Sequence, residues 1–449
     1  MNQALDASLG TTEELAMTRC RRYGAGEHRI HPDSISAQAL WVYRELRDAG
    51  HEAYLVGGCV RDLLLGRTPK DFDISTSARP DEIRGVFPRS RIVGRRFQIV
   101  HVRSGRELIE VSTFRGHHSP DFDTDGEEQP ADAAAYAASG MLLRDNVFGT
   151  IEEDALRRDF TVNGLYYDPD SNTVIDFGGG VRDLGEKMLR VIGDPVTRFQ
   201  EDPVRMLRAA RFAAKLGFTI APDALAAIER CRRLLDQIPA ARLFDEVIKL
   251  LLNGHGANTF TILDELALFA PIFPDTAQAL RSAPKGRALI LHALRNSDER
   301  IALGKPVTPA FLYAALLWPA LARQVDSLVS RAHLPMLTAI HEAGPEVIIA
   351  QCRRTVIPRR FSTPVREIWD LQQRLITRRS PRKLAAHPRF RAAYDFVLLR
   401  EQAGDRLDGA GDWWTQFQGG EAPPPPPSNP SPRRRRRRRK PNSSAADAG

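Results

Sequence analysis

Short apolar runs separated by glycines and polar residues fill the chain up to about residue 177. Runs of this length, rich in β-branched and aromatic residues, favour strands, whereas apolar spacings of three and four favour helices. We predict strands over 54–56, 72–75, 98–103, 107–113 and 174–177. We predict helices over 34–49, 60–65, 80–87 and 151–158. This mixture predicts a small mixed sheet backed by helices.

The periodicity changes beyond about residue 202, where every regular segment has helical spacing. Examples are 204–216, 222–235 and 241–252. Three consecutive glycines at 178–180 precede this region and predict a hinge. The predicted fold is therefore α+β, with a small mixed-sheet head followed by an extended all-helical body.

These changes of pattern divide the chain into five parts. We predict, in order, a poorly ordered N-terminus, a mixed-sheet head, a helical neck, a helical body and a disordered tail. Their boundaries are 1–30, 31–177, 178–255, 256–420 and 421–449.

The composition is that of an ordinary soluble protein, with 42% hydrophobic and 27% charged residues in a chain of 449. No N-terminal apolar run resembles a signal peptide. The longest strongly apolar stretch, 311–322, is too short to cross a bilayer and contains Pro319. The four cysteines and eleven histidines show neither disulfide nor zinc spacing. We therefore expect a cytoplasmic protein that has no zinc site and makes no contact with a membrane.

The net charge of +8 is concentrated at one end of the chain. Eight consecutive cations occupy 433–440, and Asp447 is the only acid from residue 422 onward, so that segment carries +7 and the rest +1. A polyproline spacer at 423–427 precedes the cations. Such a block is typical of a disordered arm that binds nucleic acid. The predicted RNA-contacting residues are Arg433, Arg434, Arg435, Arg436, Arg437, Arg438, Arg439 and Lys440.

The candidate chemistry begins where the strand at 54–56 ends in Gly57-Gly58, followed by Asp71 and Asp73. A glycine pair before a helix lets backbone N–H groups approach a phosphate. In an extended segment, Asp71 and Asp73 point to the same face, and two adjacent carboxylates favour a divalent cation such as Mg²⁺ between them. Each signal alone also fits an ordinary solvated turn. Their combination predicts a site that holds a nucleotide triphosphate on metal ions.

A two-metal site usually has a third carboxylate. Glu110 is the first choice, because it lies within an apolar strand where an acid is unexpected, and Asp159 is the other candidate. Spacing does not choose between them. The acid-rich segment 119–139 is interpreted instead as a solvated surface loop.

A second chemical signal opens the helix predicted after residue 202. Pro203 suits the first helical turn with Asp202 as its cap, and Asp202 and Arg205 then share one side of the helix. A capped helix with a surface ion pair is the alternative reading. Arg205, Arg208 and Arg211 recur every three residues and predict a cationic stripe.

Together these segments resemble the bacterial poly(A) polymerase and class II CCA-adding nucleotidyltransferase family. The resemblance is carried by 55–62, 70–73, 157–163 and 201–212. It implies that the head is a nucleotidyltransferase domain and that Asp71, Asp73 and a third acid hold Mg²⁺, for which Mn²⁺ can substitute. It also implies that the head is catalytic, that the neck carries the base-selecting element and that the body binds RNA. The resemblance further implies the remaining nucleotide contacts. These are Gly57, Gly58, Arg61, Arg158 and Asn163 for the ribose and phosphates, Asp202 and Arg205 for the base edge, and Arg208 or Arg211 for stacking or phosphate.

The polymerase and CCA-adding branches share these motifs, but three features favour the polymerase. Segments 93–102 and 110–118 resemble the polymerase form, the cationic tail suits an enzyme that acts on many RNA ends, and no appended His-Asp phosphohydrolase motif is apparent. The resemblance implies template-independent transfer of AMP from ATP to RNA 3′ ends by a monomer, with RNA-decay proteins as possible partners. The alternatives are a CCA-adding or A-adding tRNA nucleotidyltransferase and a non-catalytic RNA-binding protein with an inactive head.

Overall fold

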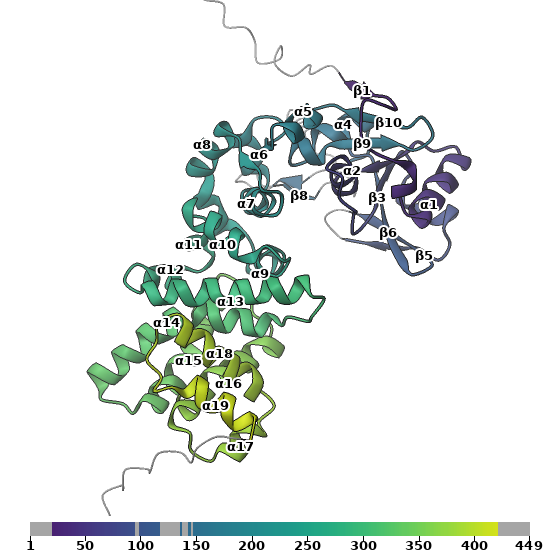
Figure 1. Ribbon diagram of the computed structural model, residues 1–449. Helices are drawn as coiled ribbons and strands as arrows, with labels where there is room; N and C mark the ends of the chain where they lie inside the picture. Colours follow the sequence, from purple (N-terminus) through teal and green to yellow (C-terminus); the bar gives the residue numbers. More distant parts are fainter. Residues whose placement is uncertain (1–19, 95–97, 117–134, 137–141, 145–146, 421–449) are drawn as a thin grey trace, which may run out of the picture.

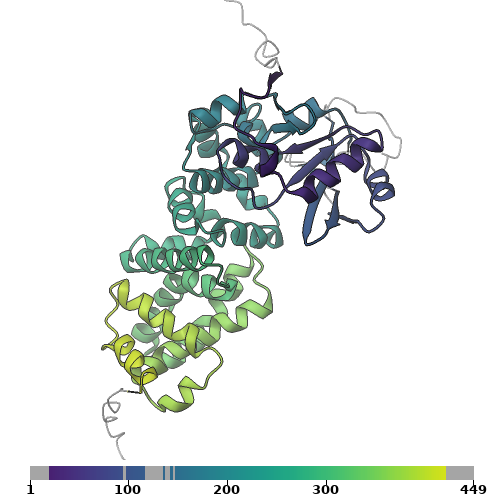
Figure 2. The ribbon, with the colours of Figure 1, turned by 45° about the vertical axis from the view of Figure 1, so that its right-hand side comes forward.

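The computed structural model describes residues 20–94, 98–116, 135–136, 142–144 and 147–420. A mixed sheet lies at one end, and a long series of helices extends away from it (Figure 1). In the turned view, the head lies at the top and the C-terminal helices lie at the bottom (Figure 2). The helices between them in the chain connect the two regions. The predicted α+β head and helical body are both confirmed.

The main sheet has eight strands in the order β1-β10-β9-β2-β3-β6-β5-β4. Their bounds are β1 Arg21–Tyr23, β2 Ala53–Val56, β3 Asp73–Thr76, β4 Arg91–Val93, β5 Ile99–Ser104, β6 Glu107–Thr113, β9 Leu165–Asp168 and β10 Thr173–Asp176. Only β3 and β6 pair in parallel, and every other pair in this sheet is antiparallel. A separate hairpin joins β7 (Ala135–Tyr136) to β8 (Leu142–Arg144).

One face of the sheet is covered by helices, whereas the other is exposed at β6 and is covered by a small apolar cluster at β2, β9 and β10. Strand β6 alternates between buried Ile109, Val111 and Thr113 and more exposed Leu108 and Glu110, as a half-buried strand does. Helices α1 (Ala37–Asp48) and α3 (Pro80–Val86) pack on the strands and bury the apolar side. Asp73 and Glu110 therefore lie on the side of the sheet that these helices leave uncovered.

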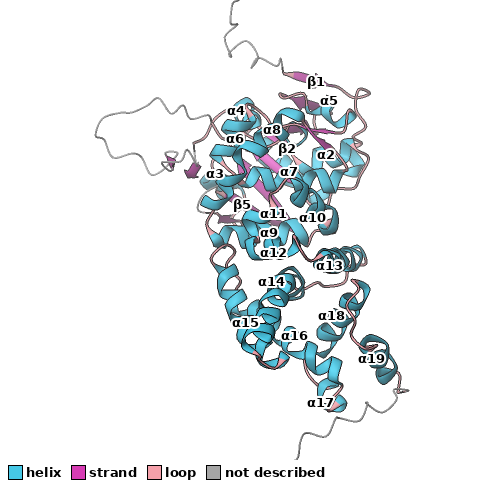
Figure 3. Ribbon diagram, turned by 90° about the vertical axis from the view of Figure 1, so that its left-hand side faces the viewer, coloured by secondary structure: helices cyan, strands magenta, loops and turns pink. Residues whose placement is uncertain are grey.

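Helices form most of the rest of the described chain, and Figure 3 shows the main sheet at the end away from the C-terminal helices. The bounds of the helices that complete the head are α2 Gly58–Leu64, α4 Ile151–Leu156 and α5 Gly180–Gly185. Those of the neck and body are α6 Pro195–Glu201, α7 Val204–Leu216, α8 Pro222–Cys231, α9 Ala240–Leu251, α10 Gly256–Glu265, α11 Phe269–Ile272, α12 Pro274–Leu280, α13 Pro284–Ala302, α14 Pro309–Ala332, α15 Met336–Cys352, α16 Arg359–Thr377, α17 Pro381–Ala385, α18 Phe390–Gln402 and α19 Ala410–Gln418. One apolar core continues from the sheet into this body, and a second core lies among α16, α18 and α19.

The structure differs from the sequence prediction at several places. Residues 21–23 form β1 at the sheet edge, so the expected poorly ordered stretch over 1–30 is wrong from residue 21 onward. Strand β12 (Thr219–Ile220) pairs in parallel with β11 (Met188–Leu189) inside the region predicted to be wholly helical. The helix predicted over 222–235 ends at Cys231 and continues as a 3₁₀ helix. Asp202 ends α6, and Pro203 stands at the N-cap of α7.

The glycines at 178–180 form an anchored turn and not the predicted hinge. The Asp176 carboxylate accepts hydrogen bonds from the backbone N–H groups of all three glycines at 2.8–3.1 Å. A Cβ at Gly180 would lie 2.2 Å from the Thr161 carbonyl oxygen. Because Asp176 holds the turn by hydrogen bonds and Thr161 packs closely against it, the turn has little freedom to bend.

None of the helices in the described part of the chain is both long enough and apolar enough to cross a membrane.

Candidate active site

Two carboxylates lie side by side on the open face of the sheet. Asp73 opens β3 and Glu110 lies on β6, and the parallel pairing places them opposite one another in register. Burial, followed by the charge of Glu110, raises the pKa of Asp73 to about 6. Asp71 adds to this effect from an exposed bend two residues before β3. The three acids therefore repel one another across a short stretch of the sheet.

This carboxylate group, defined as Asp71, Asp73 and Glu110, suits a hard divalent cation by its donor chemistry. A cation would relieve the repulsion that raises the pKa of Asp73. In the described residues, no three potential ligands are already gathered closely enough to coordinate a metal. Glu110 is 48% exposed at its side chain and lies 3.5 Å from His101 of β5, so its carboxylate is open to solvent and to a ligand.

Asp159, the other candidate for the third acid, lies in a different environment. Its carboxylate accepts hydrogen bonds from Arg208 Nε at 2.7 Å and from Asn163 Nδ2 at 3.1 Å. Burial alone would raise its pKa, but Arg208 and the hydrogen bond from Asn163 outweigh burial and hold the pKa below its usual range. The structure thus places Glu110 beside Asp73 and pairs Asp159 with an arginine of α7.

Arg158 faces the carboxylate group from the end of α4. Its guanidinium donates to Asp154 Oδ2 and to the Tyr166 hydroxyl, both at 3.0 Å. Tyr166 in turn donates to the same carboxylate oxygen of Asp154 at 2.6 Å, and Ser75 of β3 donates to it at 3.1 Å. Arg158 is therefore held in one orientation by a buried network.

Asp154 is a site residue that the sequence analysis missed. Burial alone would raise its pKa, but Arg158 and the Tyr166 hydroxyl hold that pKa below its usual range. In the sequence it follows Glu152 and Glu153 at the start of a helix, where acids are common for local reasons. Its role depends on the fully buried Tyr166 beside it in space, and the sequence does not show that these two residues are neighbours.

The predicted nucleotide-binding residues of the Gly57 turn lie beside Arg158. Gly57 has φ +74°, a backbone conformation that glycine adopts readily, and a Cβ there would meet Arg158 Nη1 at 3.4 Å. Gly58 begins α2. Arg61 on the same helix is buried and donates to Asn163 Oδ1 at 2.6 Å. Because Asn163 also donates to Asp159, a continuous polar chain connects α2 with Arg208 on α7.

The cationic stripe predicted on α7 is present. Arg205, Arg208 and Arg211 are half-buried along one side of the helix, and the Arg211 guanidinium lies 4.5 Å from the centre of the Phe212 ring. Burial and the charge of Arg208 lower the pKa of Arg211. A concentrated positive potential therefore faces the head from the neck.

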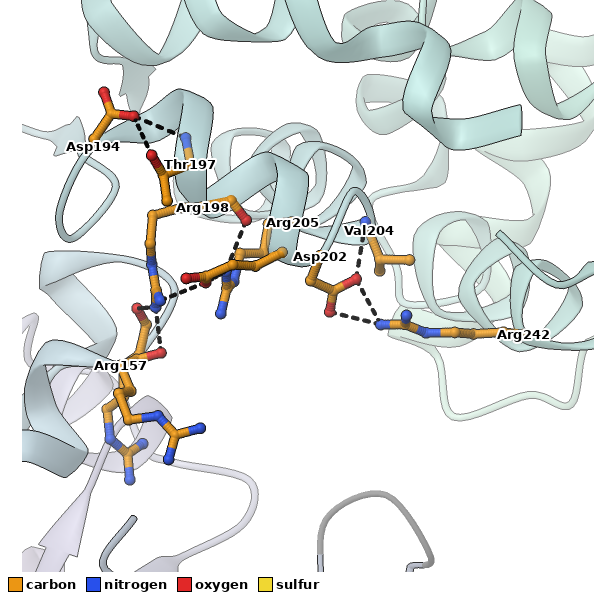
Figure 4. Close-up of polar contacts among 10 residues, drawn as sticks. Arg157, Asp194, Thr197, Arg198, Asp202, Val204, Arg205 and Arg242 are labelled. Carbon is orange, nitrogen blue, oxygen red and sulfur yellow. Dashed lines mark hydrogen bonds and ion pairs between the residues drawn. The ribbon is translucent and has the colours of Figure 1, made fainter. Parts of the chain in front are cut away.

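Asp202 and Arg205 do not form the ion pair considered as the alternative reading. Asp202 accepts from Arg242 Nη2 of α9 at 2.7 and 2.9 Å, whereas Arg205 Nη1 donates to Glu201 Oε2 at 2.7 Å (Figure 4). Arg205 also donates to the Arg198 carbonyl oxygen at 2.7 Å. Both proposed base-reading side chains are thus engaged by neighbouring residues.

Arg198 is a second residue that sequence reasoning missed. It lies on α6, is 7% exposed, and points toward the segment after α4 (Figure 4). One terminal nitrogen donates to the Arg157 and Arg158 carbonyl oxygens, and the other donates to Glu201 at 2.7 Å. Arg198 thereby fixes the backbone that carries Arg158. Only its position in an amphipathic segment could have drawn attention to it, and that pattern is common.

One cavity of about 520 Å³ brings part of this set together. Its lining contains Val56, Asp73, Ile99, Glu110, Ser112, Arg115, Asp154, Arg157, Arg158, Arg205 and Arg208. The lining does not include Asp71, Gly57, Gly58, Arg61, Asp159, Asn163, Asp202 or Arg211, which lie around it. The lining combines three carboxylates (Asp73, Glu110 and Asp154) with five arginines, so the cavity can hold a polyanion together with a cation. The predicted basic tail, 433–440, lies outside the described residues.

Three family models match the chain. Residues 53–190 match the poly A polymerase head domain, 217–280 match a probable RNA and SrmB-binding site of polymerase A, and 332–443 match a polymerase A arginine-rich C-terminus. The second and third matches lie in the neck, body and tail.

Full-length relatives agree with these matches. Poly(A) polymerase I of Salmonella typhimurium is 46% identical over 88% of this chain and 85% of its own length. The Haemophilus influenzae protein of the same name is 45% identical over 88% and 87%. A CCA-adding enzyme of Geobacillus thermodenitrificans is 37% identical over 59% and 64%.

Solved structures share the fold at lower identity. The Thermotoga maritima CCA-adding enzyme complexed with tRNA is 20% identical, has a TM-score of 0.56, and is matched over 88% of this chain and 85% of its own. The head, the helical body and the near full-length relatives lead to one assignment: the chain belongs to the poly(A) polymerase family.

Proposed function

We propose that this protein adds AMP from ATP to RNA 3′ ends without a template and releases pyrophosphate. The observation that carries the proposal is the register pairing of Asp73 with Glu110 in a cavity that five arginines also line. Nucleotidyl transfer needs both kinds of charge, because carboxylates bind the metal cations and arginines neutralise the phosphates. The 46% identity to poly(A) polymerase I over most of both chains supports the same reaction.

Asp71, Asp73 and Glu110 would hold Mg²⁺, or Mn²⁺ in its place. Such a cation, when bound, neutralises phosphate charge and lowers the pKa of the attacking RNA hydroxyl. The elevated pKa of Asp73 supports this role, because burial and the charge of Glu110 disfavour the ionised carboxylate more than Arg158 favours it. Asp159 is proposed instead to position Arg208 and Asn163.

Arg158 is proposed to bind the triphosphate. Asp154 and Tyr166 fix its guanidinium before substrate arrives, so little side-chain freedom is lost on binding. Gly57 leaves room for that guanidinium beside the turn that opens α2, and Gly58 and Arg61 belong to the same wall. The substrate would thus meet a pre-oriented cation.

Asp202 and Arg205 are proposed to recognise the base of ATP, with Arg208 and Arg211 supplying phosphate contact or stacking. In the ligand-free arrangement Asp202 is bound by Arg242 and Arg205 by Glu201. Direct reading of a base edge therefore requires these side chains to exchange partners. A site built on such hydrogen bonds rejects bases that leave its polar groups unpaired.

RNA is the proposed second substrate, and the cationic tail is proposed to bind it. Eight tail cations on single-stranded nucleic acid set an upper bound of about −5 to −6 for the slope of log affinity against log salt, at about −0.7 per phosphate. Truncation after Ala422 should flatten that slope while leaving turnover of a saturating short primer nearly unchanged.

The decisive experiment incubates the purified protein with a generic RNA and each nucleoside triphosphate in turn, with Mg²⁺, followed by gel analysis. We expect a long ladder with ATP and little extension with the others. Efficient CTP addition that stops after a few residues would instead support a tRNA nucleotidyltransferase. No incorporation with any nucleotide would support a non-catalytic RNA-binding protein.

A further inference from the structure

A cavity in the described part of the chain lies in the helical body, away from the site above. It has a volume of about 740 Å³ and is bounded by α13, α14, α16 and the segment that follows α18. These helices gather beyond α12 in Figure 3. Pro319 lies inside α14 at this point, and a Cβ on Gly286 of α13 would meet its ring at 3.0 Å. The close approach of these two helices forms the floor of the cavity.

Cations outnumber acids around this cavity. Its lining includes Lys285, Arg323, Arg400 and Arg406 but only Asp326 and Asp405. The Asp405 carboxylate already accepts a hydrogen bond from Arg400 Nε at 2.9 Å. Lys285, Arg323 and Arg406 are exposed, so they offer long mobile cations at the surface of the cavity. An anionic ligand complements this charge.

Arg400 is held in place as a flat cationic surface. Its guanidinium lies 4.4 Å from the centre of the Trp318 ring, and its Nη1 donates to Gln372 Oε1 at 3.3 Å. Gln372 is 1% exposed and donates to the Ile368 and Ala393 carbonyl oxygens, which fixes the acceptor. Both Arg400 and Trp318 line the cavity. Arginine planes and aromatic rings are the surfaces on which unstacked nucleobases rest.

We propose that this cavity, named here the body cavity, binds a nucleotide of the RNA strand upstream of its reacting 3′ end. The proposal rests on the proposed function, because it assigns part of the RNA substrate to a second place on the enzyme. The base would rest against the Arg400–Trp318 pair, and the adjacent phosphates would meet Lys285, Arg323 and Arg406. Exposed, flexible cations around an open cavity suit a continuous strand, which carries one phosphate at each step.

The test is the double variant Lys285→Ala/Arg406→Ala in the full-length protein, compared with Arg382→Ala/Lys383→Ala. The control removes one arginine and one lysine from exposed positions on α17, in the same body but outside the cavity lining. Affinity for oligo(A) of increasing length is measured at several salt concentrations, together with AMP incorporation on the same RNAs. Both variants change exposed side chains, so both should remain folded.

For wild type and control we expect affinity to rise stepwise once the RNA is long enough to reach from the active site to the body cavity. The cavity variant should lose that step, and its salt slope on long RNA should decrease by up to about 1.4, at about 0.7 per phosphate contact. Incorporation on a saturating RNA shorter than the step should be unchanged. In a second measurement, long RNA should quench tryptophan fluorescence less in Trp318→Phe than in wild type.

Three results would overturn the proposal. Equal losses in the cavity and control variants would show general electrostatic attraction only. An unchanged length profile in the cavity variant would exclude an RNA contact there. Loss of binding to free AMP, with RNA binding intact, would assign the cavity to a free nucleotide. Absence of incorporation by wild type would refute the proposed function separately, since affinity alone reports on the body cavity.

Discussion

Two neighbouring regions of the head use carboxylates in opposite ways. At the β3–β6 edge, burial and then the charge of the neighbouring Glu110 raise the pKa of Asp73 to about 6. At the junction of α4 and α7, Asp154 pairs with Arg158 and Asp159 with Arg208, and both carboxyl pKa values fall despite burial. The difference teaches that an acid without a cation is poised to accept one, whereas a paired acid orients its arginine.

The largest effect should follow loss of an edge carboxylate. Asp73→Asn or Asp71→Asn should reduce AMP incorporation by about a thousandfold or more, because lost metal stabilisation costs several kcal/mol of barrier. Incorporation is measured with saturating ATP and RNA, and circular dichroism checks the fold. Near-normal turnover by either variant would remove that residue from the metal site.

Glu110→Gln and Asp159→Asn should separate the two regions. Glu110→Gln should reduce turnover about a hundredfold or more while leaving thermal stability nearly unchanged, because its carboxylate is half-exposed. Asp159→Asn should lower the free energy of unfolding by about 1–3 kcal/mol, because Arg208 loses its charged partner. Thermal melts and single-turnover rates together distinguish the outcomes. The reverse pattern would place Asp159, and not Glu110, with the metal.

Asp202 tests whether a paired acid can also select a substrate. Asp202→Ala should narrow the preference for ATP over CTP by about tenfold or more, because a base-edge hydrogen bond is lost. Arg242→Gln is the matched control, since it removes the present partner of Asp202 and keeps the carboxylate. Competition between labelled nucleotides measures the preference. Full ATP preference in Asp202→Ala would locate base selection elsewhere.

Substitution of Asp154 tests whether this residue orients Arg158 without itself taking part in the reaction. Asp154→Asn preserves the shape but removes the charge that holds Arg158, so KM for ATP should rise by about tenfold, equivalent to about 1.4 kcal/mol. Tyr166→Phe removes one hydrogen bond from the same arginine and should have a smaller effect. Steady-state kinetics separates KM from kcat. A loss confined to kcat would contradict a role in holding Arg158 for substrate binding.

The smallest effect concerns pH in the absence of divalent cations. Because folding raises the pKa of Asp73 from 3.8 to about 6, the folded state binds this proton more tightly than the unfolded state does. Its contribution to stability is full below about pH 4 and is lost as pH rises to about 6. Asp73→Asn should therefore lose less stability across that window in EDTA, as measured by urea unfolding. Parallel curves for the two proteins would contradict the crowding of these acids.

Local pattern was enough to predict several elements closely. Helix α7 begins and ends at the predicted residues because its apolar spacing is regular and Gly217 follows it with a positive φ. Strand β6 likewise has its predicted bounds. The prediction failed for β1, whose three residues gain their structure only by pairing with the distant β10. Local sequence cannot report a partner that lies elsewhere in the chain.

The sequence by itself determined the acids, the Gly57-Gly58 turn and the cationic stripe, because residue type and short spacing set each of them. It favoured Glu110 over Asp159 as the third acid but could not exclude Asp159, because spacing along the chain does not show which acid lies beside Asp73. Only tertiary structure separated them. Parallel pairing of β3 with β6 placed Glu110 beside Asp73, and packing of α7 against the head gave Asp159 the cation Arg208. The interaction energy of two charges depends on the distance between them in space, and only long-range contacts in the folded chain set that distance.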